Sequence, residues 1–244
     1  GWGPPIWAET TAEEPGTAQA RQAVLDGAVL VCPLGGDGTV RAVAKALVDT
    51  ETPLGLLPGG TGNLLARNLD LPLDSVEKAL VVALTGHNKS VDVGQIIIDR
   101  GNGAEPEEDT FLVMAGIGFD AIVVMRTETI TRLHGFAMYF AAVLQTILFY
   151  YNAPYLESVF DGESINQRSL FLYLGLGPRG GGGFLLTPDA KWDDGLIDSV
   201  LVNPIGRLTM LKMLSSAMKG THVTSRHVTM RQNREITVKS SSPM

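Results

Sequence analysis

The chain has 244 residues, of which 45% are hydrophobic and 18% charged, a composition that excludes disordered, collagen-like and low-complexity proteins and allows a sizeable core. Its single cysteine, Cys32, excludes an internal disulfide and favours a reducing, cytoplasmic compartment. The net charge of −7 is uneven, because residues 1–199 hold 12 Lys and Arg against 25 Asp and Glu while residues 200–244 hold 7 against 1, and this acidic body argues against nucleic-acid binding.

The first part of the chain alternates between helix and strand patterns. The capping-box sequence Thr11-Ala-Glu-Glu14 predicts a helix that begins there and ends at Leu25. The continuous apolar run at residues 28–33 is typical of a strand that is covered on both faces. After the loop Gly35-Gly-Asp-Gly38, helical spacing resumes over residues 39–48.

A second strand, Gly-rich loop and helix follow at once. The predicted strand covers residues 54–57, the loop is Pro58-Gly-Gly-Thr-Gly62, and residues 63–68 begin a helix, with another helix over residues 73–85. Strands that alternate with helices through short connections predict a parallel sheet wrapped by helices. Residues 1–90 are therefore predicted to form an α/β domain.

From residue 91 onward the chain changes to short strands separated by turns. Strand patterns are predicted at residues 91–98, 111–115, 159–160, 169–174, 196–202, 223–230 and 235–239. The exceptions are a helix over residues 207–218 and an apolar helix over 136–151, which is shorter than the roughly 20 residues of a membrane span. Residues 91–244 are therefore predicted to form a second domain, a mostly antiparallel β-sandwich.

The two Gly-rich loops carry the strongest chemical signal. They occupy the same position in consecutive strand-to-helix units, where backbone N–H groups and helix N-termini hold phosphate. Gly35, Gly36 and Gly38 let the backbone approach phosphates, and Thr39 offers a hydroxyl. Asp37 repels an anion unless a cation lies between them, and the Mg²⁺ of an ATP complex resolves that conflict. The alternative is a pair of tight turns around small residues.

These loops resemble those of a known family. Gly35-Gly-Asp-Gly-Thr39 followed by Leu57-Pro-Gly-Gly-Thr-Gly-Asn63 is similar to the diacylglycerol kinase catalytic domain, of the soluble bacterial lipid kinase type shared with sphingosine kinases. Val91-Asp-Val-Gly94, Ala115-Gly-Ile-Gly-Phe-Asp120 and Pro188-Asp-Ala-Lys-Trp-Asp-Asp-Gly195 fall where that family has comparable segments, so the resemblance covers essentially the whole chain. The first loop alone also occurs in NAD kinases.

The resemblance implies a nucleotide-binding domain and a lipid-substrate domain that together use ATP and Mg²⁺ to phosphorylate a lipid hydroxyl, converting diacylglycerol to phosphatidic acid. It implies catalytic roles for Asp37 and Asp92, which would hold the water network of the Mg²⁺. It implies a second, structural metal at Lys191, Asp194 and Leu196, held by one carboxylate and two backbone carbonyls. The residues implied at the nucleotide are Thr10, Gly35, Gly36, Asp37, Gly38, Thr39, Gly60, Thr61, Gly62 and Asn63.

The sequence departs from the family pattern at three places. Leu64 stands where many relatives have an acid after the second loop. The family's opening strand is expected to be missing before Trp7, and its general base, the Glu of an Asp-Gly-Glu, is expected to be missing after the last strands. Asp161-Gly-Glu163 lies between two strand patterns and is predicted to be a hairpin turn. The alternatives are therefore a sphingoid-base kinase, an NAD kinase-like enzyme or a non-catalytic homologue that binds lipid or nucleotide.

The expected partner is a lipid substrate at a membrane surface. Peripheral contact is expected through the apolar segment 136–151 and the basic stretch from Arg207 to Lys239. Nucleic acid is not expected as a partner, and a second copy of the chain, in a homodimer, is a further candidate. The expected localisation is cytoplasmic, with peripheral membrane association.

Overall fold

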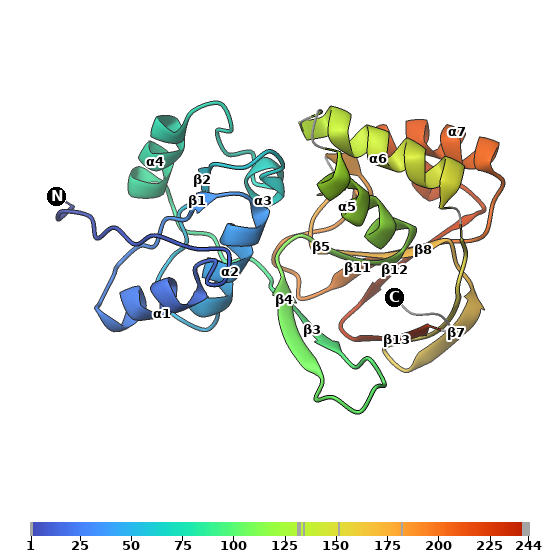
Figure 1. The fold of residues 1–244 in the computed structure, drawn as a ribbon, viewed down its shortest axis with the longest axis horizontal. Helices are drawn as coiled ribbons and strands as arrows, with labels where there is room; N and C mark the ends of the chain where they lie inside the picture. Colours follow the sequence, from blue (N-terminus) through green and yellow to red (C-terminus); the bar gives the residue numbers. More distant parts are fainter. Residues whose placement is uncertain (1, 131–132, 134, 151, 182, 241–244) are drawn as a thin grey trace. The chain divides into compact units, whose positions relative to one another are not determined.

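The computed structural model describes every residue except 1, 131, 132, 134, 151, 182 and 241–244. The chain divides into two compact units, Gly1–Lys89 and Ser90–Met244 (Figure 1). Each unit has its own helices, strands and cluster of buried hydrophobic side chains. No helix in the described ranges is both long and apolar enough to span a membrane.

The first helix, α1 (Thr17–Leu25), begins later than the capping box predicts. Thr11 and Glu14 do form a turn, in which the Glu14 N–H donates to Thr11 Oγ1 at 3.1 Å. Pro15 has no N–H to donate, and Gly16 takes a φ of 132°, so this turn does not continue into the helix. The predicted end of the helix is confirmed.

The parallel pairing predicted for unit 1 is confirmed, but it is short. The strand predicted at residues 28–33 is wrong, because only Val31 of that run forms a bridge and Val29 is 69% exposed. β1 (Leu34–Gly35) pairs in parallel with β2 (Leu57–Pro58). A single bridge between Val31 and Leu54 continues the same register toward the N-terminal ends of the two segments. Each Gly-rich loop therefore begins where the paired residues end, so both loops leave the same edge of the sheet.

Three further helices complete unit 1: α2 (Asp37–Leu47), α3 (Leu64–Asn68) and α4 (Val76–Thr85). α2 is amphipathic, and its Val43 and Leu47 pack with Ala20 of α1 in one buried cluster. α4 begins after Ser75, whose hydroxyl accepts a hydrogen bond from the Lys78 N–H at 3.2 Å. Such an N-cap satisfies one of the helix's first N–H groups, and this fixes the start of α4.

Unit 2 is built from antiparallel sheets and three helices. The four-stranded sheet has the order β12-β11-β8-β5, formed by Val228–Asn233, Ile197–Val202, Phe171–Gly175 and Met114–Gly118. The three-stranded sheet has the order β13-β6-β7, formed by Ile236–Ser240, Tyr155–Phe160 and Glu163–Arg168. Two hairpins are formed by β3 (Gly94–Ile98) with β4 (Glu107–Phe111) and β9 (Arg179–Gly180) with β10 (Phe184–Leu185). The helices are α5 (Phe119–Thr129), α6 (Gly135–Phe149), α7 (Arg207–Met218) and the 3₁₀ turn η1 (Thr221–Thr224).

Unit 2 has three layers (Figure 1). The helices α5, α6 and α7 cover one face of the four-stranded sheet, and the three-stranded sheet covers the other. Alternation along the strands sends side chains to two cores: Tyr173 and Val200 face the helices, whereas Leu172 and Leu201 pack against Phe160 of the three-stranded sheet. The predicted fold class, an α/β domain with a parallel sheet and a mostly antiparallel β-sandwich domain, is confirmed.

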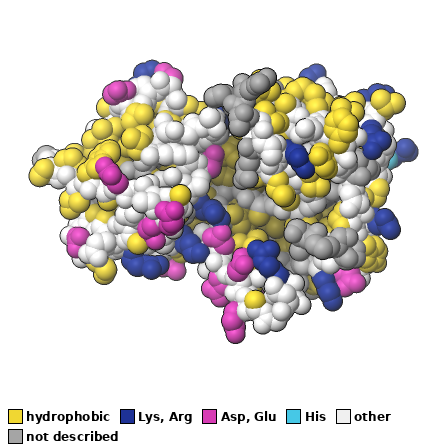
Figure 2. All heavy atoms as spheres, in the orientation of Figure 1, with side chains coloured by type: hydrophobic (Ala, Val, Ile, Leu, Met, Phe, Trp, Pro, Cys, Tyr) yellow, Lys and Arg dark blue, Asp and Glu magenta, His cyan; other side chains and the backbone are white. Residues whose placement is uncertain are grey.

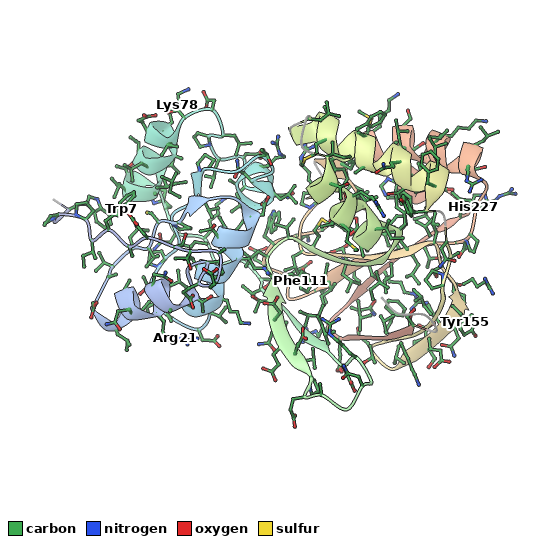
Figure 3. All side chains as sticks on the ribbon, viewed as in Figure 1. Trp7, Arg21, Lys78, Phe111, Tyr155 and His227 are labelled. Carbon is green, nitrogen blue, oxygen red and sulfur yellow. The ribbon has the colours of Figure 1, made fainter. Side chains whose placement is uncertain are left out.

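The structure corrects two expectations for unit 2. The strand predicted at residues 111–115 is two strands, β4 and β5, with a bend between them. Phe111, labelled in Figure 3, ends β4 and packs on Gly94 of β3 so closely that a Cβ there would collide with its ring. The predicted strand 223–230 begins as η1 and becomes extended only at Val228. Tyr151, the predicted end of the apolar helix, lies outside the described residues.

Candidate functional site

The two Gly-rich loops cross each other at their backbones. The Gly59 N–H donates to the Gly35 carbonyl at 3.0 Å. Gly60 lies directly against Gly36, and a Cβ added to Gly60 would collide with the Gly36 Cα. The close approach of the two backbones therefore requires glycine at position 60, whereas a Cβ at Gly36 would make only an ordinary contact, 3.4 Å from the Gly60 Cα. The crossing brings together the nucleotide-site residues predicted on the two loops.

Asn63 shapes the second loop from within. Its Oδ1 accepts from the Gly60 N–H at 3.1 Å, and its Nδ2 donates to the Gly60 carbonyl at 2.7 Å. Asn63 takes a left-handed conformation with a φ of 48° just before α3, which Asn tolerates better than most residues. The side chain therefore closes the loop, and this is a structural role beside the predicted contact with nucleotide.

Asp37, the first residue of α2, links the two loops. Its Oδ1 accepts from the Leu64 N–H at 2.6 Å. Asp37 as a whole residue is exposed, but its carboxyl lies among the backbone atoms of the second loop. The loss of water around the carboxyl raises the pKa of Asp37, and hydrogen bonds from the N–H groups of Leu64 and Asn63 oppose this rise. A carboxylate beside the two Gly-rich loops is the type of ligand that the Mg²⁺ of a nucleotide complex uses, since Mg²⁺ takes one or two carboxylates together with phosphate oxygens and waters.

The first turn of α2 faces this crossing. Its N-cap is Gly36, and within the described residues no side-chain hydrogen bond caps the helix. The N–H groups at the start of a helix lack intrahelical partners, carry partial positive charge and bind phosphate. Gly38 has open space where a Cβ would lie, and Thr39 packs against Gly35. The first loop therefore presents backbone donors with little side-chain cover.

Arg67 is a residue that the sequence patterns missed. It lies on α3, and its Nη2 donates to the Gly62 carbonyl at 3.4 Å. Its positive charge is among the groups that oppose the burial-driven rise in the pKa of Asp37. The sequence places Arg67 beside the second loop only through the short helix predicted at residues 63–68, on which it lies three residues after Leu64. Arg67 adds a cation beside the second loop, and a guanidinium is a group that binds anions such as phosphate.

Two threonines predicted at the nucleotide lie on the surface of unit 1. Thr61 is exposed in the second loop. Thr10 is also exposed, and a Cβ added to Gly16, the N-cap of α1, would lie 3.6 Å from its methyl group. Thr10 therefore lies at the start of α1, and its contact with a nucleotide stays a prediction.

Asp92 holds a turn of unit 2. Its Oδ2 accepts from the Gly195 N–H at 2.8 Å, and its own N–H donates to the Trp192 carbonyl at 2.6 Å. Asp92 lies just before β3, and the turn that it holds lies just before β11. The structure therefore brings Asp92 together with the turn that carries all three predicted metal residues.

That turn, residues 191–196, offers oxygen ligands. Asp194 Oδ1 accepts from the Leu196 N–H at 3.1 Å. Gly195 takes a φ of 70°, which bends the backbone sharply between them. The predicted ligands Lys191 and Leu196 would contribute backbone carbonyls. A carboxylate next to bent backbone is the type of donor set that a hard cation uses.

Asp198, at the start of β11, is a second residue that the sequence patterns missed. It is buried, its Oδ1 accepts from Gln232 at 3.1 Å, and its Oδ2 has no hydrogen-bond partner among the described residues. Burial raises the pKa of Asp198, and the negative charges of Asp194 and Asp189 raise it further. This excess of negative charge fits a cation at the turn. No group of three or more His, Cys, Asp or Glu side chains in the described part of the chain is arranged to hold a metal, so backbone carbonyls and waters would complete its shell.

The Asp161-Gly-Glu163 sequence forms the predicted hairpin turn between β6 and β7. Glu163 accepts two hydrogen bonds from the Arg231 guanidinium, at 2.8 and 2.9 Å. Asp161 accepts from the backbone N–H groups of Arg234 and Glu235 at 3.0 and 2.9 Å. Both carboxylates have structural partners, as expected for a turn.

The chain is similar to known proteins over both units. The model of the family described as "Diacylglycerol kinase catalytic domain" matches residues 6–96. That of the "YegS C-terminal NAD kinase beta sandwich-like domain" matches residues 113–244, more than half of the chain. A diacylglycerol kinase of Mycobacterium tuberculosis is 33% identical over 202 residues, which are 82% of this chain and 63% of that protein. A diacylglycerol kinase of Bacillus subtilis is 27% identical over 240 residues, or 96% of this chain and 75% of that protein.

A solved structure shares the fold. A diacylglycerol kinase from Bacillus anthracis matches with a TM-score of 0.71 at 22% sequence identity, covering 96% of this chain and 74% of that chain. The chain spans less than two thirds of the length of its Mycobacterium tuberculosis relative. The two family models cover the two units in the same order as the structure divides them. The chain belongs to the family of diacylglycerol kinases and YegS-like lipid kinases.

Proposed function

We propose that the protein is a Mg²⁺-dependent kinase that transfers the γ-phosphoryl group of ATP to a lipid hydroxyl, with diacylglycerol as substrate and phosphatidic acid as product. The observation that carries the proposal is the crossing of the two Gly-rich loops beside Asp37, in a chain whose relatives are named diacylglycerol kinases. Phosphoryl transfer requires positioning and charge neutralisation more than covalent chemistry, and backbone donors, a carboxylate and a guanidinium serve those purposes.

Each part of the crossing has a role in this proposal. The N–H groups at the first turn of α2 bind the phosphates, and the absence of a side chain at Gly60 lets the two backbones lie close together. Mg²⁺, when bound, neutralises phosphate charge, and Asp37 would be its protein ligand. Arg67 adds positive charge beside the second loop. In unit 2, apart from the crossing, Asp92 holds the backbone of the turn at residues 191–196, where a second cation would have a structural role.

A substrate panel tests the proposal. The protein is incubated with γ-labelled ATP, Mg²⁺ and, separately, 1,2-dioctanoylglycerol, sphingosine or NAD. We expect label in the phosphatidic acid alone. Label in sphingosine phosphate or in NADP would instead assign the sphingoid-base or the NAD kinase alternative. Binding of ATP without transfer to any of the three would assign the non-catalytic alternative.

We propose further that unit 2 docks on an anionic membrane through the ends of α6 and α7. Leu148 and Phe149 are 55% and 73% exposed, and Leu208 is 77% exposed. The Arg207 Nε donates to the Ile147 carbonyl at 3.1 Å, so these two helix ends are adjacent. Figure 2 shows hydrophobic side chains gathered over α6 with Lys and Arg side chains beside them. Residues 200–234 hold six Lys and Arg and no Asp or Glu, so the charge suits anionic headgroups.

Vesicle sedimentation tests this docking. Binding to vesicles that contain phosphatidylglycerol is expected to fall as NaCl is raised, because salt screens the headgroup attraction. The double variant Phe149→Ser and Leu208→Ser is expected to bind about tenfold or more weakly, because two apolar side chains no longer leave water. Ile97→Ser, which alters an exposed side chain of β3, is the matched control. Equal binding to anionic and neutral vesicles at every salt concentration would refute the docking.

A further inference from the structure

Gly62, in the second Gly-rich loop, contacts both charged side chains of the loop crossing. A Cβ added to Gly62 would collide with Asp37 Oδ2. Apart from the chain neighbours of Gly62, only the Asp37 carboxyl lies within 4 Å of such a Cβ among the described residues. The Gly62 carbonyl accepts a hydrogen bond from Arg67 Nη2 at 3.4 Å. One residue without a side chain therefore lies against the carboxylate and binds the guanidinium.

The backbone of Gly62 does not itself require glycine. Its φ is not among the left-handed values of the chain, so a residue with a side chain can adopt this backbone without strain. The space over its Cα is taken by the Asp37 carboxyl, whose Oδ1 accepts from the Leu64 N–H at 2.6 Å. Glycine at position 62 is therefore explained by the carboxyl for which it leaves room.

Asp37 and Arg67 are held separately. Within the described part of the chain, Arg67 forms neither a hydrogen bond nor an ion pair with the Asp37 carboxyl, although its positive charge acts on that carboxyl. A direct pair would cancel the charge of both groups. Because the Leu64 N–H holds the carboxylate and the Gly62 carbonyl holds the guanidinium, both charges stay available to ligands.

We propose that Gly62 is a positioning residue that keeps Asp37 and Arg67 apart, so that the carboxylate can bind the Mg²⁺ of a nucleotide complex and the guanidinium its phosphates. The two ligands rest on the proposed function, whereas the contacts of Gly62 do not. A side chain at position 62 would push the carboxyl out of its place and leave it to be drawn to the positive charge of Arg67. This role acts through Asp37 and differs from the nucleotide contact that the resemblance implies for Gly62.

A double-mutant cycle tests the contact between Gly62 and the carboxyl without any ligand. Gly62→Ala is expected to lower the melting temperature by about 3 °C, because the displaced carboxyl gives up its hydrogen bond to the Leu64 N–H. In the Asp37→Ala background the added methyl group meets no carboxyl. There we expect the melting temperature to stay the same or to rise slightly, since Ala restricts the unfolded chain.

Gly38→Ala is the matched control for this cycle. It adds the same methyl group one residue after Asp37, where nothing lies within 4 Å of the new Cβ. Its shift in melting temperature is expected to be equal in the two backgrounds. If the shift caused by Gly62→Ala were also equal in the two backgrounds, the carboxyl would not occupy the space over Gly62, and the proposal would be overturned.

The Mg²⁺ dependence of ADP binding tests the consequence for the site. Calorimetry gives the affinity for ADP in Mg²⁺ and in EDTA, and the ratio of the two affinities measures how strongly Mg²⁺ and ADP favour each other's binding. This ratio is expected to fall about tenfold in Gly62→Ala, because the displaced Asp37 no longer binds the metal. A ratio equal to that of the unaltered protein would overturn the positioning role, whatever the affinity in EDTA.

Arg67→Met covers the case in which Gly62→Ala does not fold, which circular dichroism would reveal. Met keeps an apolar side chain but has no guanidinium. If the two charges are held apart, the affinity for ADP in EDTA is expected to fall about tenfold, while the Mg²⁺ ratio stays the same. A clear rise in the ratio would show that Arg67 neutralises Asp37 in the unaltered protein, and this would also overturn the proposal.

These measurements separate the positioning role from the proposed function. A protein whose cycle shows coupling between Gly62 and Asp37, but which binds no ADP with or without Mg²⁺, would refute the proposed function and keep Gly62 as the residue that positions the carboxyl. A protein that phosphorylates dioctanoylglycerol but shows no such coupling would keep the function and refute the positioning role.

Discussion

Asp37→Asn is expected to slow phosphoryl transfer to dioctanoylglycerol about a hundredfold or more while the protein stays folded. The substitution removes the carboxylate charge of Asp37 at the loop crossing and with it the proposed ligand of the nucleotide's Mg²⁺. The fold survives because Asn keeps an Oδ1 that accepts from the Leu64 N–H, so the tie between the loops remains. Turnover of labelled ATP and thermal unfolding measure the two effects separately.

Two further variants decide what Asp37 does. Asp49→Asn changes the net charge by the same amount on an exposed residue whose φ of 59° Asn also tolerates, and its activity is expected to match that of the unaltered protein. Asp37→Ala removes both the charge and the acceptor for Leu64. If Asp37→Asn kept full activity while Asp37→Ala lost activity and thermal stability together, Asp37 would be a structural tie between the loops and not a ligand.

The local pattern of the sequence was enough to predict the scaffold of unit 1. Apolar runs that end in glycine loops predicted a parallel pairing and the helices that follow it, although the first paired strand is Leu34–Gly35 and not residues 28–33. Register was not predictable, and it is register that sets Gly60 against Gly36 and makes the loops cross. The predicted start of α1 was wrong because Pro15 and Gly16 separate the capping turn from the helix. The capping-box motif therefore predicted the turn at residues 11–14 but not where α1 begins.

The contacts that organise the candidate site are long-range, and this explains what the sequence patterns missed. Asp92 binds Gly195 from 103 positions away, so its link to the turn at residues 191–196 requires the folded unit 2. Asp198 is buried by its neighbours across the sheet, and burial, which the local sequence does not reveal, is the largest cause of the raised pKa of its carboxyl. α5 was missed because glycines precede it and it has little helical amphipathicity to detect.

Rising pH is expected to destabilise the folded protein through Asp120. This carboxyl is buried at the start of α5, and burial raises its pKa to about 6 although the Tyr139 hydroxyl opposes the shift. In the unfolded chain the same group titrates near its ordinary value of 3.8. Between these two pKa values the folded state holds a proton that the unfolded state has released. The stability that this proton contributes is complete below the unfolded pKa and is lost as pH rises through about 6.

Comparison with Asp120→Asn isolates this titration, because all other ionisable groups are common to the two proteins. Asn cannot ionise, and its Oδ1 still accepts from the Tyr139 hydroxyl. Urea unfolding is expected to show the variant gaining about 2 to 3 kcal/mol over the unaltered protein between about pH 4 and about pH 8, since each unit of pKa shift is worth about 1.4 kcal/mol. A difference that stayed constant over this range would mean that Asp120 titrates at its ordinary pKa in the folded protein, and the predicted loss of stability would be wrong.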